Sequence, residues 1–260
     1  MDAGDPRLAT LLHVALGLAE EAGAVTLQHF GAVLPSDEKA DGTPVTVADR
    51  AAETLLRERI GAQFPDHGIL GEEFGEKSPG ASIRWILDPI DGTLSFMRGV
   101  PLYGVLIGIE VEGEPRVGVA HFPALRETVG AALGHGCLWN GRPARVSGIR
   151  ELGGALALTT DPARILREPM APGWDRLVRE CSLIRSWGDC YGHILVATGR
   201  ADIMVDPVLS PWDAAPFAPI LSEAGGVFTD KEGNSRRNGG SGVSTNGLLH
   251  EEVLAILRGT

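Results

Sequence analysis

Apolar side chains recur along this chain at two spacings, one typical of helices and the other of strands. Leucines and alanines at every third or fourth position predict an amphipathic helix over residues 6–33, and Thr46 is the expected N-cap of a second helix over 47–64. Later helices are predicted at 173–181, 192–198 and 211–223. Apolar and β-branched runs predict strands just before residue 71 and at 83–87, 104–110, 117–122, 128–132, 137–140, 155–159, 183–186, 201–205 and 227–229. The polar segments 37–44 and 76–81 are predicted loops. Helices and strands alternate throughout, which predicts a layered α/β (α+β) fold.

Composition and charge narrow the class of protein. Of the 260 residues, 43% are hydrophobic and 22% are charged, which is typical of a globular chain and excludes wholesale disorder. Lys and Arg number 23 against 34 Asp and Glu, so the formal net charge is −11. Such a surface repels polyanions, and the nearest approach to a basic patch is the pair Arg236–Arg237. We therefore expect no nucleic-acid partner.

The start of the chain and its apolar stretches bear on location. The first residues lack a basic segment followed by an apolar run, and no apolar stretch approaches the roughly 20 residues that span a bilayer. We therefore expect no signal peptide, no membrane contact and a cytoplasmic location.

A change of composition near 146–154 predicts a border between an N-terminal α+β subdomain, 1–147, and a C-terminal α/β subdomain, 148–260. The cysteines Cys137, Cys181 and Cys190 have no C-x-x-C spacing, so we expect small buried apolar side chains.

The densest chemical signal is the segment Trp85-Ile-Leu-Asp88-Pro-Ile-Asp91-Gly-Thr93. A buried strand delivers two carboxylates three positions apart, and Pro89 bends the chain so that Asp91 returns towards Asp88. Two such carboxylates repel each other unless a cation lies between them, and their hard oxygen atoms favour magnesium or manganese over zinc. The free amides of Gly92 and Thr93, at a predicted helix start, suit a phosphate.

Further acids stand at comparable places along the chain. Glu72 follows a short predicted strand, and Asp49 and Asp213 each stand at the start of a predicted helix. Any one of them is usually a helix cap or an exposed charge. Taken together with the two aspartates of the 85–93 segment, they suggest a site with several carboxylates and more than one metal ion.

With these segments, the chain resembles the inositol monophosphatase family of magnesium-dependent, lithium-sensitive phosphatases. The resemblance covers essentially the whole chain and is carried by five segments in the family's order: Thr46-Val-Ala-Asp49, Gly71-Glu-Glu73, the 85–93 segment, Trp212-Asp-Ala-Ala-Pro-Phe-Ala-Pro-Ile-Leu-Ser-Glu-Ala-Gly-Gly226 and Ser244-Thr-Asn-Gly247. It implies a layered αβαβα sandwich of the inositol monophosphatase and sugar phosphatase type, with the site between the two halves. Family members commonly pair, so it also implies a homodimer.

The resemblance assigns roles to individual residues. Metal ligands are expected at Glu72, Asp88, Asp91, Asp213 and the carbonyl of Ile90, with Mg²⁺ as the cofactor and Mn²⁺ as a substitute. Gly92 and Thr93 fall where the family binds phosphate. The catalytic residues are expected to be Glu72 and Thr93, which orient the attacking water, and Asp49, which helps to position metal-bound water. Lys39 is expected to be either a supporting cation or a solvated loop charge. The implied reaction is in-line attack of an activated water on a phosphomonoester, without a covalent phospho-enzyme.

Substrate choice depends on the segment that follows Gly188. The run Gly188-Asp-Cys-Tyr-Gly-His193, joined to 195–202, resembles the histidinol-phosphatase branch of the family. The expected substrate contacts are Asp91, Asp189 and Asp206. Two carboxylates beside the ring of Tyr191 favour a cationic alcohol over a neutral polyol. Asp189 has an alternative role as a cap of the following helix, and His193 is interpreted as a packed or capping residue rather than a ligand.

Three functions are therefore open. The leading one is a Mg²⁺-dependent phosphomonoester hydrolase acting on histidinol phosphate, in L-histidine biosynthesis. The second is an inositol-1-monophosphatase or a broad phosphatase for sugar or nucleotide phosphates. The third is a non-catalytic RNA- or protein-binding member on the same scaffold, against which the acidic surface and the full set of acids argue.

Overall fold

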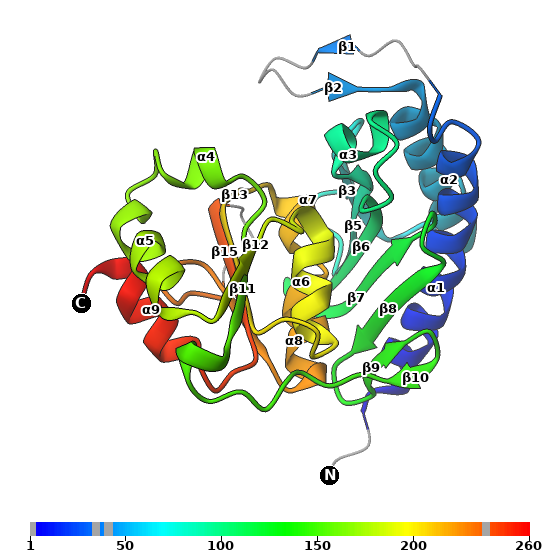
Figure 1. Cartoon of the computed structure of the whole chain (residues 1–260). Helices are drawn as coiled ribbons and strands as arrows, with labels where there is room; N and C mark the ends of the chain where they lie inside the picture. The colour runs from blue at the N-terminus through cyan, green and yellow to red at the C-terminus, as the bar shows by residue number, and fades with distance from the viewer. Residues whose placement is uncertain (1–3, 33–36, 39–43, 236–239) are drawn as a thin grey trace.

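The computed structural model describes residues 4–32, 37–38, 44–235 and 240–260, and only the backbone at 37–38 and 44–45. The elements stack in five layers (Figure 1). One outer layer holds α1 (Pro6–Leu27) and α2 (Val47–Gln63), the middle one α6 (Asp189–Ala197) and α8 (Phe217–Ala224), and the other outer one α5 (Ala171–Glu180) and α9 (His250–Arg258). A β-sheet separates each pair of helical layers, so the predicted αβαβα sandwich is confirmed.

The larger sheet has eight strands in the order β10-β9-β8-β7-β6-β5-β3-β4. Its members are β3 (Gly68–Gly71), β4 (Gly75–Lys77), β5 (Ile83–Asp91), β6 (Gly104–Val111), β7 (Glu114–Phe122), β8 (Glu127–Ala132), β9 (Gly136–Trp139) and β10 (Arg142–Pro143). Neighbours pair antiparallel except for β3 and β5, which run parallel. The register of β5 on β6 shifts between Asp88 and Asp91, so the central strand is irregular where its two acids stand.

The smaller sheet has five strands in the order β12-β11-β13-β15-β14. They are β11 (Leu156–Leu158), β12 (Leu183–Arg185), β13 (Ile203–Leu209), β14 (Val227–Thr229) and β15 (Gly240–Thr245). β11 lies parallel to β12 and β13, whereas β15 pairs antiparallel with β13 and β14. The remaining elements are α3 (Thr93–Met97), η1 (Leu152–Gly154), α4 (Pro162–Ile165), α7 (Pro211–Ala214) and the backbone pair β1 (Asp37–Glu38) and β2 (Pro44–Val45).

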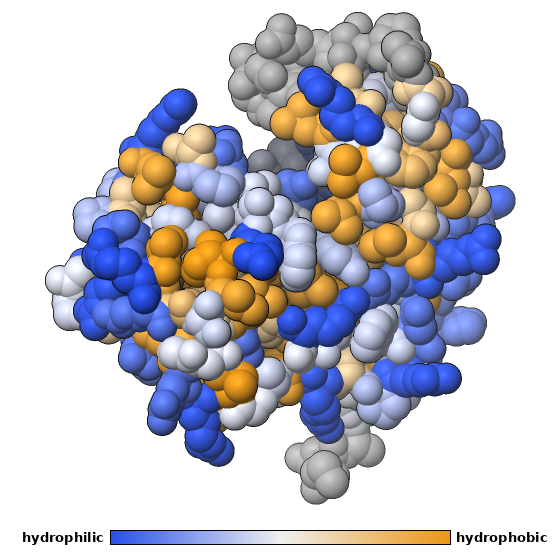
Figure 2. Space-filling view, viewed as in Figure 1, coloured by the Kyte–Doolittle hydropathy of each residue, from blue (hydrophilic) through white to orange (hydrophobic). Residues whose placement is uncertain are grey.

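Separate apolar clusters hold these layers together. One lies between α1, α2 and the larger sheet, a second surrounds α6 and α8 between the two sheets, and a third joins α5 and α9 to the outer face of the smaller sheet. Cys137, Cys181 and Cys190 are buried and free, as predicted. On the face shown in Figure 2, hydrophilic residues surround apolar patches. The division into 1–147 and 148–260 stays a prediction, as do the homodimer and the cytoplasmic location.

Several predicted boundaries are wrong for local reasons. α1 ends at Leu27 rather than near residue 33, because Gln28 caps it and Gly31 adopts a φ of 76°; residue 33 itself lies outside the described part of the chain. The helix predicted over 211–223 divides at Pro216, which has no amide hydrogen to continue α7 into α8. The predicted loops at 37–44 and 76–81 contain strand residues of β1, β2 and β4.

Helix α1 contradicts the expectation that no apolar stretch approaches the length needed to span a bilayer. Within the described residues, α1 has 22 residues and is long and apolar enough to cross a membrane by length and composition alone. Its buried leucines and alanines face the cluster that joins α1 to α2 and the larger sheet. A buried core helix passes the same test, so this finding is weak evidence for a membrane span.

Candidate active site

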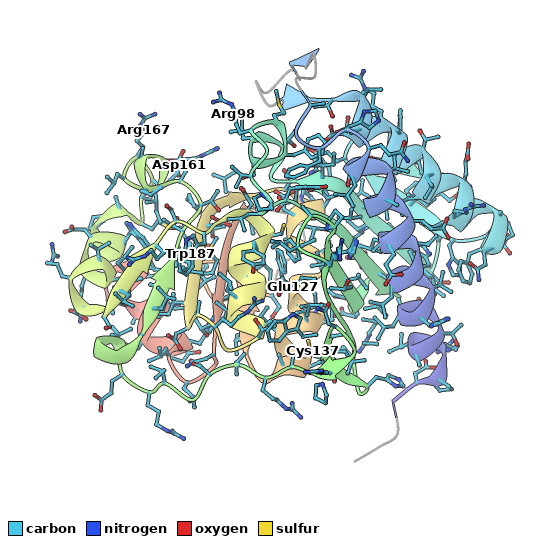
Figure 3. All side chains as sticks on the ribbon, turned by 45° about the vertical axis from the view of Figure 1, so that its right-hand side comes forward. Arg98, Glu127, Cys137, Asp161, Arg167 and Trp187 are labelled. Atoms are coloured by element: carbon cyan, nitrogen blue, oxygen red, sulfur yellow. The ribbon has the colours of Figure 1, made fainter. Side chains whose placement is uncertain are left out.

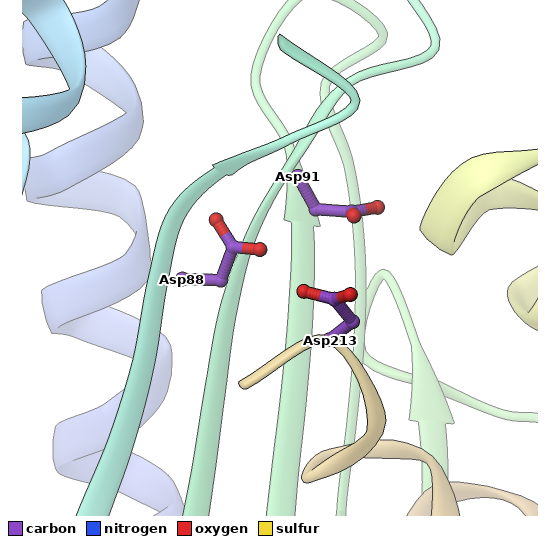
Figure 4. Close-up of side chains that lie close together, drawn as sticks. All are labelled: Asp88, Asp91 and Asp213. Carbon is purple, nitrogen blue, oxygen red and sulfur yellow. The ribbon is translucent and has the colours of Figure 1, made fainter. Parts of the chain in front are cut away.

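The irregular end of β5 directs two carboxylates into one site. Asp88 is only 1% exposed, and one of its oxygens, Oδ1, accepts a hydrogen bond from the amide of Ile90 at 3.0 Å. That bond closes a turn over Pro89, and the register shift lets Asp91 follow on the same side (Figure 4). The amide of Cys190, from α6 in the middle layer, donates to Asp91 Oδ2 at 2.6 Å. The predicted return of Asp91 towards Asp88 is therefore seen in the structure.

A third carboxylate comes from far along the chain. Asp213 is the third residue of α7, and its Oδ2 accepts a hydrogen bond from the Ser210 amide at 2.7 Å in a capping box. This cap orients the side chain towards the end of β5. Asp88, Asp91 and Asp213 each offer an oxygen within 4.8 Å of the others (Figure 4). The structure thus brings together three of the predicted ligands across more than 120 residues of sequence.

The electrostatics of this cluster favour a bound cation. Burial raises the pKa of Asp88 well above its usual value, and the nearby charges of Glu72, Asp91 and Asp213 raise it further. Burial likewise raises the pKa of Asp91, and it raises that of Asp213 to about 6. Within the described residues, no Lys or Arg forms an ion pair with these three aspartates. Clustered oxygen donors without a cationic partner fit a hard divalent ion.

The loop that carries Glu72 is held by a residue that the sequence analysis did not single out. Glu53 is fully buried on α2, and its carboxylate accepts hydrogen bonds from the amides of Glu73 at 2.7 Å and Phe74 at 3.2 Å. The amide of Glu72 itself bonds to the carbonyl of Leu87 at 3.2 Å, which ties the loop to β5. The signal for Glu53 was an acid on the inward face of an amphipathic helix.

Asp49 lies at the start of α2 and is 1% exposed. Its Oδ2 accepts hydrogen bonds from the Thr46 amide at 2.8 Å and the Thr46 hydroxyl at 2.6 Å, which completes a capping box. Burial raises its pKa to about 6, and Glu73 contributes a further rise. The cap is thus confirmed, but Asp49 is not part of the cluster of three aspartates, and its predicted role in positioning water stays a prediction.

The turn after Asp91 has the form expected of a helix start. Gly92 is the N-cap of α3 with a φ of 80°, a conformation that favours glycine. The Thr93 hydroxyl donates to the carbonyl of Ile90 at 3.1 Å, so these two predicted site groups meet. Their roles towards phosphate and metal stay predictions. Lys39 lies outside the described residues.

Asp189 faces this turn from α6 in the middle layer. It adopts a φ of 50°, and its side chain makes no capping bond to α6, so the interpretation of Asp189 as a helix cap is wrong. Its Oδ2 instead accepts a hydrogen bond from Ser95 at 3.4 Å, and a Cβ placed on Gly92 would lie 3.1 Å from the same oxygen. Burial and the charge of Asp206 raise the pKa of Asp189, to about 6.

Asp206 occupies a more enclosed position than the predicted substrate contact requires. It is 2% exposed, and its oxygens bond to the amide of Thr160 at 3.3 Å and to Nε2 of His193 at 3.2 Å. His193 is fully buried and stacks on Phe217 with ring centroids 4.3 Å apart. The interpretation of His193 as a packed residue is confirmed.

Comparison with known proteins shows which family the chain belongs to. The profile of the Inositol monophosphatase family matches residues 7–259. A protein named histidinol-phosphatase from Chlorobaculum parvum (strain DSM 263 / NCIMB 8327) is 48% identical over 248 residues, which cover 95% of this chain and 96% of that protein. Among solved structures, the Thermotoga maritima IMPase is 30% identical, with a TM-score of 0.88 over 96% of this chain and 97% of its own. The extragenic suppressor protein suhB from Bartonella henselae is 29% identical, also with a TM-score of 0.88, over 96% and 98%.

Proposed function

This chain belongs to the inositol monophosphatase family and is a phosphomonoester hydrolase, and from that premise we propose that it hydrolyses histidinol phosphate with Mg²⁺ as its cofactor. The observation that carries the choice of substrate is the carboxylate of Asp189 beside Gly92, where the alcohol part of a bound phosphoester would lie. The 48% identical relative named histidinol-phosphatase supports it.

The metal proposal rests on the donor set. Asp88, Asp91 and Asp213 would hold the first ion, and Glu72 and the Ile90 carbonyl would complete the ligands. Mn²⁺ is the expected substitute because it prefers the same oxygen donors. When bound, the metal neutralises charge on the phosphate and lowers the pKa of a water molecule.

The chain's own groups do the positioning. In the proposed mechanism, Glu72 accepts a proton from the attacking water and the Thr93 hydroxyl orients that water. The amides of Gly92 and Thr93 donate to phosphate oxygens, since they stand at the first turn of α3. Water attacks phosphorus in line with the departing alcohol oxygen, and this reaction requires no covalent intermediate. The departing oxygen takes up a proton from water as its bond to phosphorus breaks, so the products are the alcohol and inorganic phosphate. Asp49 would act at a distance, by fixing the start of α2.

Substrate choice follows from the charge of the alcohol. Histidinol phosphate carries an ammonium group and an imidazole, whereas inositol phosphate has a neutral ring. The partly buried carboxylate of Asp189 favours the cationic alcohol. Asp206 contributes to the negative potential beside Asp189, and its direct contact with the alcohol stays a prediction.

The test compares initial rates of phosphate release from L-histidinol phosphate and from myo-inositol 1-phosphate, with and without Mg²⁺. We expect a higher kcat/KM for histidinol phosphate and no release without the metal. Asp189→Asn should raise KM about tenfold or more for the cationic ester and leave the neutral one nearly unchanged. Asp161→Asn, which removes a charge at the exposed cap of α4, is the matched control. Equal rates on the two esters would contradict the substrate, and a preference for inositol phosphate would establish the inositol-1-monophosphatase alternative.

A further inference from the structure

We propose that Thr160 is a positioning residue that fixes the direction of the Asp189 carboxylate and thereby the selectivity for the alcohol. The inference deepens the proposed function, because it assumes that Asp189 faces the substrate. Thr160 lies in the loop between β11, a strand of the smaller sheet, and α4, and no sequence motif marks it. Figure 3 labels its neighbour Asp161 and the exposed Trp187, which precedes Gly188.

The first step is the bond that Thr160 makes to α6. Its Oγ1 accepts a hydrogen bond from the amide of Asp189 at 2.8 Å. The two segments are in close contact here, since a Cβ placed on Gly188 would lie 2.2 Å from Thr160 Cα. The hydroxyl therefore holds the backbone amide of Asp189 directly.

The backbone of Asp189 has an unusual conformation at this bond. Asp189 adopts a φ of 50°, which costs a non-glycine residue about 1 kcal/mol. A residue stays in that region only where its surroundings fix it. With this φ, the carboxylate turns away from α6 and reaches Ser95 and Gly92 across the boundary between the two sheets.

Thr160 is itself held by a hydrogen-bonded network inside the smaller sheet. Its amide donates to Asp206 at 3.3 Å, and Asp206 contacts Nε2 of His193 at 3.2 Å. The other ring nitrogen, Nδ1, lies 2.7 Å from the hydroxyl of Ser244 on β15. Asp206, His193 and Ser244 are all buried, so this network ties Thr160 to the interior of the smaller sheet. It gives the buried histidine a role beyond packing.

The test uses substitutions that keep the shape of the side chain. Thr160→Val removes the hydroxyl alone and should raise KM for histidinol phosphate about three- to tenfold, with kcat within about twofold, because one hydrogen bond is lost. Turnover of the neutral ester should not change. Thr160→Ser restores the acceptor and should restore KM. Thr159→Val is the matched control, because the hydroxyl of Thr159 is buried and has no hydrogen-bond partner in the described part of the chain.

A double-mutant cycle separates this inference from the proposed function. If Thr160 acts through Asp189, Thr160→Val should add little in an Asp189→Asn background, whichever ester the wild-type enzyme turns over fastest. Additive effects, or equal KM values for the Val and Ser variants, would overturn the inference. Failure of the wild type to prefer histidinol phosphate would instead contradict the substrate. A crystal structure of Thr160→Val needs no substrate: the inference requires the Asp189 carboxylate to leave Gly92, and an unmoved side chain refutes it.

Discussion

Asp213→Asn should stabilise the metal-free protein and remove its activity. Burial raises the pKa of Asp213 from the ordinary 3.8 to about 6, so the folded state binds this proton more tightly than the unfolded chain does. At a pH well above both values, ionisation of Asp213 therefore costs about 3 kcal/mol of folding free energy. Asparagine removes the charge but keeps an acceptor for the Ser210 amide, so the cap of α7 is retained.

The sign of the pH dependence follows from the raised pKa. Below about pH 3, Asp213 is protonated in both the folded and the unfolded state, and it costs nothing. The cost grows as the pH rises from about 3 to 6, because the unfolded chain loses its proton first, and it is complete above that range. Some of it is shared with Asp88, whose charge is coupled to that of Asp213, so we expect a net gain of about 1–3 kcal/mol at pH 8.

The assay is thermal unfolding in EDTA at pH 8 and pH 4.5. A chain of this size shifts in Tm by about 2–4 °C per kcal/mol, so Asp213→Asn should unfold several degrees above the wild type at pH 8 and above it by roughly a third of that margin at pH 4.5. Adding Mg²⁺ should raise the wild-type Tm more than that of the variant. Asp202→Asn is the control: Asp202 is buried away from the cluster of three aspartates and accepts a hydrogen bond from the Leu156 amide at 2.7 Å, so its substitution should destabilise. A lower Tm for Asp213→Asn in EDTA at pH 8 would refute the reasoning.

Two further substitutions probe the supports of the site. Gly92→Ala should lower the unfolding free energy by about 1–2 kcal/mol, because φ is 80°, and should reduce kcat/KM for histidinol phosphate, because the new Cβ would contact Asp189. Gly141→Ala, at a φ of 75° with no atom within 4 Å of the new Cβ, should share only the loss of stability. Equal losses of kcat/KM in the two variants, measured on fully folded protein, would contradict this. Glu53→Gln should raise the Mg²⁺ concentration for half-maximal activity and lower the unfolding free energy by about 1–2 kcal/mol, because it weakens the hydrogen bonds that hold the loop of Glu72. Glu58→Gln, at an exposed position of the same helix, should change neither quantity. An unaltered Mg²⁺ titration of Glu53→Gln would contradict the prediction.

The sequence was informative where local chemistry is decisive. The pair Asp88 and Asp91 was recognisable because Pro89 turns the chain after a buried apolar strand. Asp213 was recognisable from its place at a helix start, although the geometry that aims it came from Ser210, a cap visible in the sequence as Ser-Pro-Trp-Asp. In these places one local rule settles the conformation.

Contacts between distant segments could not be predicted in this way. Pro89 interrupts the pairing of β5, but the register that β5 resumes on β6 depends on the neighbouring strand, which lies outside residues 83–91. The alternative role of Asp189 as a cap is the usual outcome for an acid at a helix start, but its side chain makes no capping bond. Its amide donates instead to the hydroxyl of Thr160, 29 positions earlier, a contact that no local rule predicts. Pro216, by contrast, was a readable break that the apolar pattern of α7 and α8 obscured.

The central claim is that carboxylates from separate segments hold divalent cations against a phosphoester. The most direct measurement is anomalous diffraction from crystals soaked in Mn²⁺. We predict a peak within ligand distance of Asp88, Asp91 and Asp213, with Glu72 at its edge, and its loss in Asp91→Asn crystals. A cation bound elsewhere, or these side chains pointing apart with no peak between them, would contradict the account.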